Sequence, residues 1–411
     1  MRAPSPRPLA ALVLCCATLA GCGKGTQGPG EAGVVRSSPA PKAQGVVGIS
    51  TKNTTRLGGV GAAEDAAAVA QAVYPGFTPA TRPQAVVLAD ERDWPTALAA
   101  ASLASAPLGA PLLYADGDSL PSASDGALQA MRPIGATSLS GAQVVRIGTG
   151  AAVPGGLRTR DLAAGNEPAS TAVAIMHLLA AAQGHSAHAV IVLAQDASRA
   201  LQMPAASLAA ESGAPILLIT RAAVPLATSN ALKALKHPTI YVVAPTTLHS
   251  GAYAALARLG TVVHVTGTAG PDEGAAHADE NAVENSISVS RFSHGSFGWG
   301  IHEAGHGLVF ANLARPLDAP AAAPLSAHGD YGPLLLLEHS ASVPPSLTHY
   351  LSDIEPGYTA AVPPVREVYN HGWLIGDESA ISALAQAELD TVLEIAPRQP
   401  SAAEQSVAEA E

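Results

Sequence analysis

The feature that most limits how this chain can fold is a block of sequence that occurs three times. Each copy has a small residue followed by a proline, then an apolar run, and a second proline at a nearly constant distance from the first. The copies span residues 110–121, 214–225 and 332–344. Another apolar run lies upstream of each copy, at almost the same distance every time. Repetition at a nearly fixed spacing indicates three structurally similar units.

Each unit is expected to alternate short apolar strands with alanine-rich helices. The strands that begin each unit's core are predicted at 85–90, 189–194 and 307–311, and the third strands at 143–148, 239–244 and 368–375. Uniformly apolar strands that alternate with helices are typical of parallel sheets covered on both faces. The sequence therefore predicts an α/β fold of three Rossmann-like parallel-sheet units. Their expected ranges are 50–153, 158–268 and 288–393.

The first 22 residues have the layout of a secretory leader. Arg2 and Arg7 precede a short apolar stretch that ends in Leu-Ala-Gly-Cys at Cys22, which resembles the lipobox of bacterial lipoproteins. Residues 1–21 are therefore predicted to be a signal peptide. The resemblance implies diacylglyceryl attachment at Cys22, with acyl chains such as palmitate anchoring the protein in a membrane. The other cysteines, Cys15 and Cys16, also lie in this leader, so no disulfide or thiolate metal site is expected elsewhere.

Composition limits what the rest of the chain can do. Residues 22–49 are rich in Gly and Pro and are predicted to be a flexible tether, and residues 394–411 a disordered tail. The formal net charge of −11 argues against a nucleic-acid binder. After the leader, no apolar run reaches the roughly 20 residues that a membrane span needs.

Several of these elements together resemble the cell wall binding repeat 2 family. Arg56 and Gly59 match the family's Arg-x-x-Gly start, Asp318 with its neighbours matches an Asp-Ala element, and Gly376 matches the closing glycine. Such repeats come in threes on bacterial surface proteins, fold as α/β modules around a pseudo-threefold axis and hold anionic wall polymers non-covalently. The resemblance implies Arg56, Arg291 and Asp318 as ligand contacts.

The function expected from this resemblance is binding of a cell-wall polymer or glycan without catalysis or a cofactor. The protein would be extracytoplasmic and associated with the cell wall, held in the cell membrane or outer membrane by its lipid. Binding is expected in grooves between units, where strand carboxyl ends and helix N-termini present backbone N–H groups to anions.

Departures from the family pattern concern these contacts more than the fold. The Asp of the third repeat is replaced by Thr96 in the first and Leu201 in the second. Arg291 lies much closer to the strand that follows it than Arg56 does, so the third unit is expected to lack its first helix.

Two alternative functions stay open. Residues 302–306 read His-Glu-x-x-His, the zinc metalloprotease signature, in which His302 and His306 would bind zinc from one helical face and Glu303 would be the general base. Gly300, Gly305 and the expected strand start at 307 disfavour a helix there. The other alternative is a solute-binding lipoprotein of a transporter, which would have two lobes and one cleft.

Overall fold

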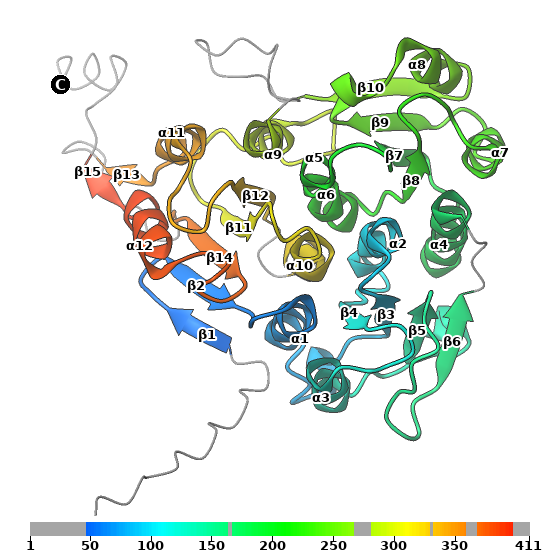
Figure 1. Cartoon of the computed structure of the whole chain (residues 1–411), viewed down its shortest axis with the longest axis horizontal. Coiled ribbons are helices and arrows are strands. Elements are labelled where there is room, and N and C mark those ends of the chain that lie inside the picture. The colour runs from blue at the N-terminus through cyan, green and yellow to red at the C-terminus, as the bar shows by residue number, and fades with distance from the viewer. Residues whose placement is uncertain (1–46, 163–166, 267–280, 329–331, 359–367, 398–411) are drawn as a thin grey trace, which may run out of the picture. The chain divides into compact units, whose positions relative to one another are not determined.

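The computed structural model describes residues 47–162, 167–266, 281–328, 332–358 and 368–397. The predicted signal peptide, Cys22 and the tether up to residue 46 lie outside these ranges, as do residues 398–411 of the predicted tail. Three largely parallel sheets with helices between them confirm the predicted α/β class (Figure 1).

The first sheet has the strand order β4-β3-β5-β6. Its strands are β3 (Val86–Asp90), β4 (Leu112–Ala115), β5 (Val144–Ile147) and β6 (Thr159–Leu162). The helices of this part of the chain are α1 (Ala62–Val73), α2 (Trp94–Ala100), which continues as a 3-10 turn over Ala101–Ala104, and α3 (Ser122–Met131).

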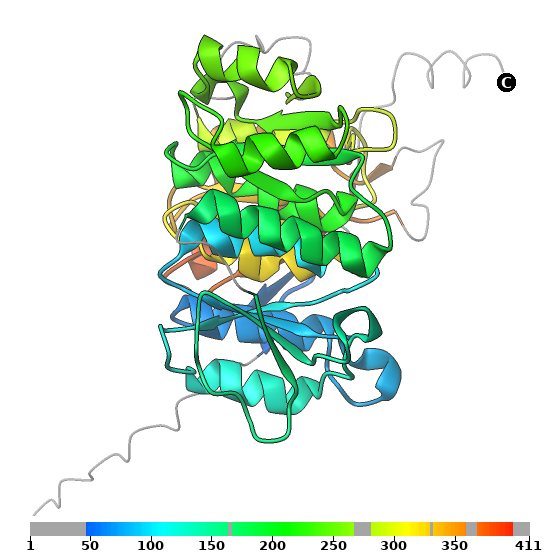
Figure 2. The same cartoon turned by 90° about the vertical axis from the view of Figure 1, so that its right-hand side faces the viewer.

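The second sheet repeats this arrangement in the order β8-β7-β9-β10. Its strands are β7 (Ala189–Ala194), β8 (Ile216–Ile219), β9 (Thr239–Val243) and β10 (Thr261–Val265). The accompanying helices are α4 (Pro168–Gln183), α5 (Arg199–Gln202), α6 (Pro204–Ser212), α7 (Leu226–Ala234) and α8 (Ser250–Ala257). Seen from the side, α4 runs between the second sheet and the first unit (Figure 2).

The third sheet has the order β12-β11-β14-β2-β1. Its strands are β11 (Gly307–Asn312), β12 (Leu334–Leu337), β14 (His371–Ile375), β2 (Thr54–Leu57) and β1 (Val47–Ser50). The helices are α9 (Ala282–Arg291), α10 (Asp318–Ala327), α11 (Pro345–Asp353) and α12 (Ala383–Val392). A short parallel pair joins β13 (Gly357–Tyr358) to β15 (Ala396–Pro397), so two residues of the predicted tail are paired.

The register between the first two strands is the same in every sheet. Val87 pairs with Leu112, Ile191 with Ile216 and Val309 with Leu334, and the partner lies equally far along the chain in each case. Identical offsets place equivalent side chains on equivalent faces. The constant distance between apolar runs in the sequence therefore corresponds to the constant register of the first two strands in each sheet.

In each sheet the fourth strand lies outside the unit's own three-strand core. In the third sheet this strand comes from the N-terminal end of the described chain. β6 completes the first sheet and β10 the second, whereas β2 pairs in parallel with β14 through Thr55 and Trp373. β1 then adds antiparallel to β2. The N-terminal strands thereby join the first unit to the third.

Three small-residue helices meet where the units come together. The 3-10 turn after α2 packs against both α6 and α10, and α6 packs against α10 (Figure 1). Alanine and serine dominate these segments and are almost fully buried, which allows the helix backbones to approach closely. Ser207 of α6 accepts a hydrogen bond at 3.2 Å from the backbone N–H of Leu334 in the third sheet.

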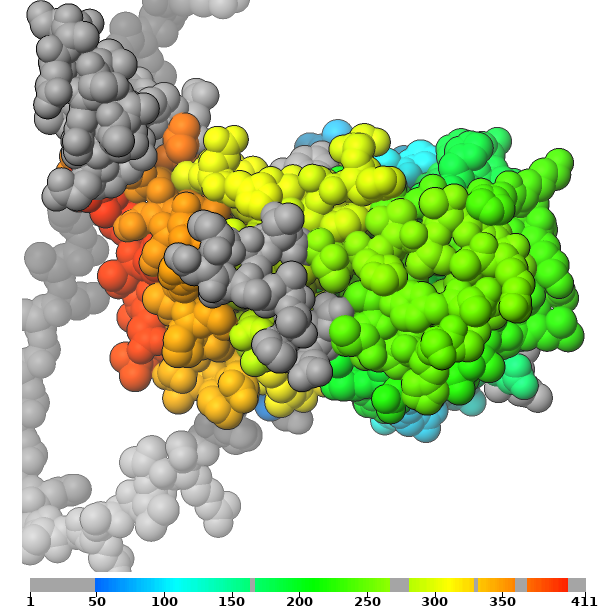
Figure 3. Space-filling view, turned by 90° about the horizontal axis from the view of Figure 1, so that it is seen from above, coloured from blue at the N-terminus to red at the C-terminus, as the bar shows by residue number. Residues whose placement is uncertain are grey.

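The expectation that the third unit lacks its first helix is wrong. Helix α9 ends at Arg291, so the helix lies before this arginine, whereas Arg56 lies on β2 and precedes α1. The two arginines therefore do not occupy equivalent positions in their units, and their distances to the following strand do not report whether a helix is present. From above, the chain that contains α9 (yellow) lies between the second unit (green) and the third (orange; Figure 3). Across the described residues, no helix combines the length and apolar character needed to cross a bilayer.

Candidate functional site

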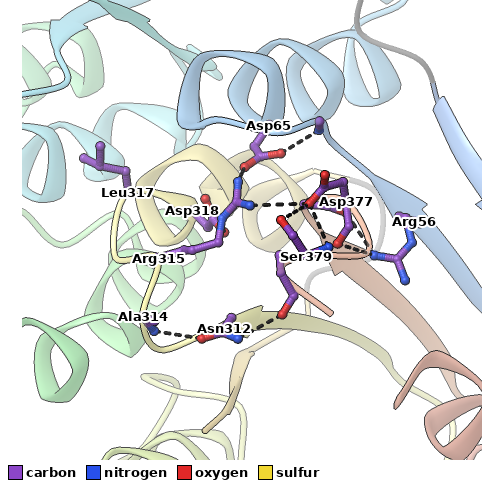
Figure 4. Close-up of polar contacts among 12 residues, drawn as sticks. Arg56, Asp65, Asn312, Ala314, Arg315, Leu317, Asp318, Asp377 and Ser379 are labelled. Atoms are coloured by element: carbon purple, nitrogen blue, oxygen red, sulfur yellow. Dashed lines mark hydrogen bonds and ion pairs between the residues drawn. The ribbon is translucent and has the colours of Figure 1, made fainter. Parts of the chain in front are cut away.

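The most charged buried site joins α1 to the third unit, and we call it the closing junction: Asp65, Arg315, Asp318 and Asp377 (Figure 4). Arg315 lies in the loop after β11, where its guanidinium pairs with Asp65 of α1 and, at 3.1 Å from Nε, with Asp318 at the start of α10. Asp377, after β14, lies 3.7 Å from the same guanidinium. Asp65 and Asp318 are 0% and 1% exposed, so two carboxyl groups share one largely buried cation.

Burial, followed by the neighbouring Asp65 carboxyl, raises the pKa of Asp318 well above its ordinary value. Burial also raises the pKa of Asp65, although Arg315 and the backbone N–H of Gly59 oppose this shift. The Gly59 N–H donates to Asp65 at 2.7 Å. The pair therefore retains a proton to higher pH than two isolated carboxyl groups would. Since these carboxyl groups are buried away from solvent, the chemistry of the site is that of a structural junction.

Arg56, a predicted ligand contact, is buried beside this junction. Its guanidinium donates to the backbone oxygens of Gly376 and Asp377 at 3.1 and 2.8 Å, and to Oε1 of Gln386 on α12. Burial lowers the pKa of Arg56. Its partners are thus groups of the third unit, reached from the N-terminal strand β2.

The positions equivalent to Asp65 and Asp318 are uncharged at the other two unit junctions. Thr171 of α4 and Thr96 of α2 occupy them between the first and second units. At the junction between the second and third units, Asn285 of α9 donates to the backbone oxygen of Leu201 at 2.8 Å. Thr96 and Leu201 are the counterparts of Asp318 that the repeats predict. Asp65 and Arg315 do not follow from the repeats, although an Asp in the first turn of an alanine-rich helix is a usable signal for Asp65.

Arg291, the third predicted contact, lies in the last turn of α9. It forms an ion pair with Asp353 of α11, and its guanidinium carbon lies 5.0 Å above the ring of Tyr350. The structure therefore brings Arg56 and Asp318 to one region and leaves Arg291 in another.

The His-Glu-x-x-His segment is not helical. Residues 302–306 form an irregular stretch directly before β11, as the repeat register predicted. His302 and His306 therefore lack the shared helical face that the zinc motif requires. Burial lowers the pKa of His306, and the backbone N–H groups of Gly305 and His306 donate to Asn370. In the part of the chain that the structure describes, no three His, Cys, Asp or Glu side chains gather in an arrangement that could hold a metal.

A groove of about 520 Å³ lies where the sequence analysis expected ligand, between strand carboxyl ends and the start of α1. It is lined by Glu64, Glu91, Arg92 and Asp116, with Leu317 from the third unit. Burial and the nearby carboxylates of Asp116 and Asp90 raise the pKa of Glu91. Three carboxylates against one guanidinium make this groove acidic, which is unfavourable for an anionic polymer.

The fold is similar to solved structures of two cell wall proteins of Clostridium difficile. Cwp6 superposes with a TM-score of 0.61 at 17% identity, covering 89% of this chain and 50% of the Cwp6 chain. Cwp8 superposes with a TM-score of 0.56 at 16% identity, covering 83% of this chain and 51% of the other. This chain thus spans about half the length of each. No family model and no curated protein matches the sequence. The fold is therefore of the class found in these cell wall proteins.

Proposed function

We propose that this chain is a lipid-anchored extracytoplasmic protein that binds a cell-wall or envelope polymer non-covalently and performs no catalysis. The observation that carries the proposal is the fold, which nearly the whole chain shares with Cwp6. The lipobox-like ending of the leader at Cys22 supports the anchor.

The described structure favours this function over both alternatives. A transporter's binding protein would have two lobes, whereas the chain forms three largely parallel sheets with equal register. The zinc hydrolase would need a helix at residues 302–306, where the chain is irregular. In this proposal Arg56 and Asp318 hold the first and third units together, since both are buried among protein groups.

The test is co-sedimentation of the chain from residue 23 onward with purified bacterial cell walls. Residues 43–411 form one compact unit, so this form retains the whole folded body. We expect saturable binding that is lost when the walls are stripped of accessory polymers. Absence of binding would reject the proposal. Zinc measured in the same protein at one equivalent, and lost in His302→Ala, would support the hydrolase.

A further inference from the structure

Four arginines gather at the amino end of the first sheet. They are Arg82 before β3, Arg132 at the end of α3, and Arg158 and Arg160 at the start of β6. Among the described residues none of the four forms an ion pair with a carboxylate, whereas Arg92, Arg146, Arg291 and Arg315 all do. An excess of positive charge in one place is unexpected in a chain of net charge −11.

Two open grooves are lined by these arginines. One, of about 330 Å³, lies between α3 and residues 154–157 and contains Arg82, Arg132 and Gln129. Arg132 donates to the backbone oxygen of Gly76, and Nε of Arg82 is buried without a hydrogen-bond partner. The other groove, of about 500 Å³, lies beside β6 and contains Arg158, Arg160 and the hydroxyl-bearing Ser140 and Thr159.

The guanidinium of Arg158 is held in place by the chain around it. Its Nε donates to the backbone oxygen of Gly141 at 2.7 Å. A Cβ at Gly135 or Gly141, both with positive φ, would lie within 2.9 Å of its terminal nitrogen. These glycines leave the space that the guanidinium occupies, so Arg158 is positioned before any ligand binds.

The two grooves meet at Gln143, which lines the first. Its Oε1 accepts a hydrogen bond from the backbone N–H of Arg158 at 3.1 Å, and Arg158 lines the second groove. The carboxylates of the neighbouring elements accept hydrogen bonds from other side chains. Asp161 of β6 accepts from Nε and Nη2 of Arg146 at 2.6 and 2.9 Å, and Asp125 of α3 accepts from Gln129.

We propose that this amino-end groove pair, defined by Arg82, Arg132, Arg158 and Arg160, binds a segment of a polymer that carries repeated phosphate or carboxylate groups. Guanidinium groups recognise both anions through paired N–H donors. Several cations along one path suit a polymer better than a single small anion. The proposal rests on the proposed function and moves its binding surface to the end of the sheet opposite the acidic groove.

The test measures binding of the chain from residue 23 onward to inorganic polyphosphate and to polygalacturonate, as phosphate and carboxylate probes. The variant carries Arg158→Gln with Arg160→Gln. The matched control carries Arg199→Gln with Arg258→Gln, two exposed arginines of the second unit that lose the same charge. We expect at least a tenfold loss of affinity for one probe in the variant and less than twofold in the control. Because the contacts are ionic, the wild-type affinity should also fall with added salt.

Melting temperatures equal to that of the wild type would show that both variants are folded. The probe that responds identifies the anion. Equal losses in variant and control would overturn the proposal, as would no loss in either. If the variant sediments with cell walls as the wild type does, the groove pair is rejected while the proposed function stands. If the wild type itself does not sediment, the proposed function fails independently of the probe result.

Discussion

The closing junction between the third and first units differs from the two other junctions in the same ring of repeats. All three join the first helix of one unit to the central helix of the unit before it. Among the described residues, the closing junction uses buried charge, through Asp65, Arg315 and Asp318. The equivalent positions hold the uncharged Thr171 and Thr96 at one of the other junctions, and Asn285, which donates to the backbone oxygen of Leu201, at the other. It also joins distant parts of the described chain, since Arg315 and Asp65 are 250 positions apart in sequence.

This difference indicates that the closing junction contributes to the correct pairing of the first and third units more than to the stability of the fold. Buried ion pairs recover little more than their own desolvation, but a mismatched partner for Arg315 would be strongly unfavourable. The two junctions between consecutive units need no such device, because the connecting chain already brings their helices together.

Replacing Arg315 by Met should cost about 3–5 kcal/mol of unfolding free energy, since two buried carboxyl groups lose their shared cation. The matched variant is Arg199→Met, an exposed arginine that also follows the first strand of its unit, which should change stability by less than about 0.5 kcal/mol. Denaturant titration followed by circular dichroism measures both. Similar losses in the two variants would mean that the closing junction is not special.

The turns that end the third strands provide a second contrast. Gly148, Ala244 and Gly376 occupy the equivalent position, all with positive φ. Gly148→Ala should cost about 1–2 kcal/mol from backbone strain alone, since its Cβ would meet nothing within 4 Å. Gly376→Ala, beside the closing junction, should cost about 1–3 kcal/mol more, because its Cβ would lie 2.6 Å from that of Ala380. Thermal unfolding of both variants gives the difference, and equal shifts would contradict it.

Asp318→Asn should have the smallest effect, and one that depends on pH. The raised pKa of Asp318 means that folding takes up a proton above the ordinary carboxyl value of 3.8. The contribution of Asp318 to wild-type stability therefore falls as the pH rises from that value toward its folded pKa. Asparagine cannot titrate, so the variant should gain in melting temperature relative to wild type as the pH is raised above about 4. Asp116→Asn, on an exposed loop, serves as the control. A difference that is flat or shrinks with pH would reject the shift.

The two ends of the first sheet show a further difference, in surface charge. The carboxyl end carries Glu64, Glu91 and Asp116 around one arginine, and the amino end carries four arginines without a carboxylate partner in the described chain. The repeat pattern predicts anion binding at the carboxyl ends of the strands, where helix N-termini favour it. The acidic side chains at the carboxyl end repel anions, so the candidate anion-binding surface is at the amino end of the sheet.

The sequence alone establishes the number of units, the three core strands of each unit and the α/β class, but not the fourth strands β2, β6 and β10. Apolar runs at constant spacing report which segments are buried, and the constant offset between paired strands preserves that spacing in the fold. It also placed residues 302–306 before a strand rather than on a helix, because glycines and the repeat register are local signals.

How the units close and where charge collects depend on long-range contacts that the sequence does not show. The pairing of β2 with β14 joins strands from opposite ends of the described chain, and no local pattern around Thr55 or Trp373 encodes it. The same closure buries Arg56 and Asp318, which by residue type alone would be surface contacts. The four arginines of the groove pair come together because α3, the segments that precede β3 and β5, and the start of β6 converge. Such convergence depends on long-range packing, which periodicity along a chain does not record.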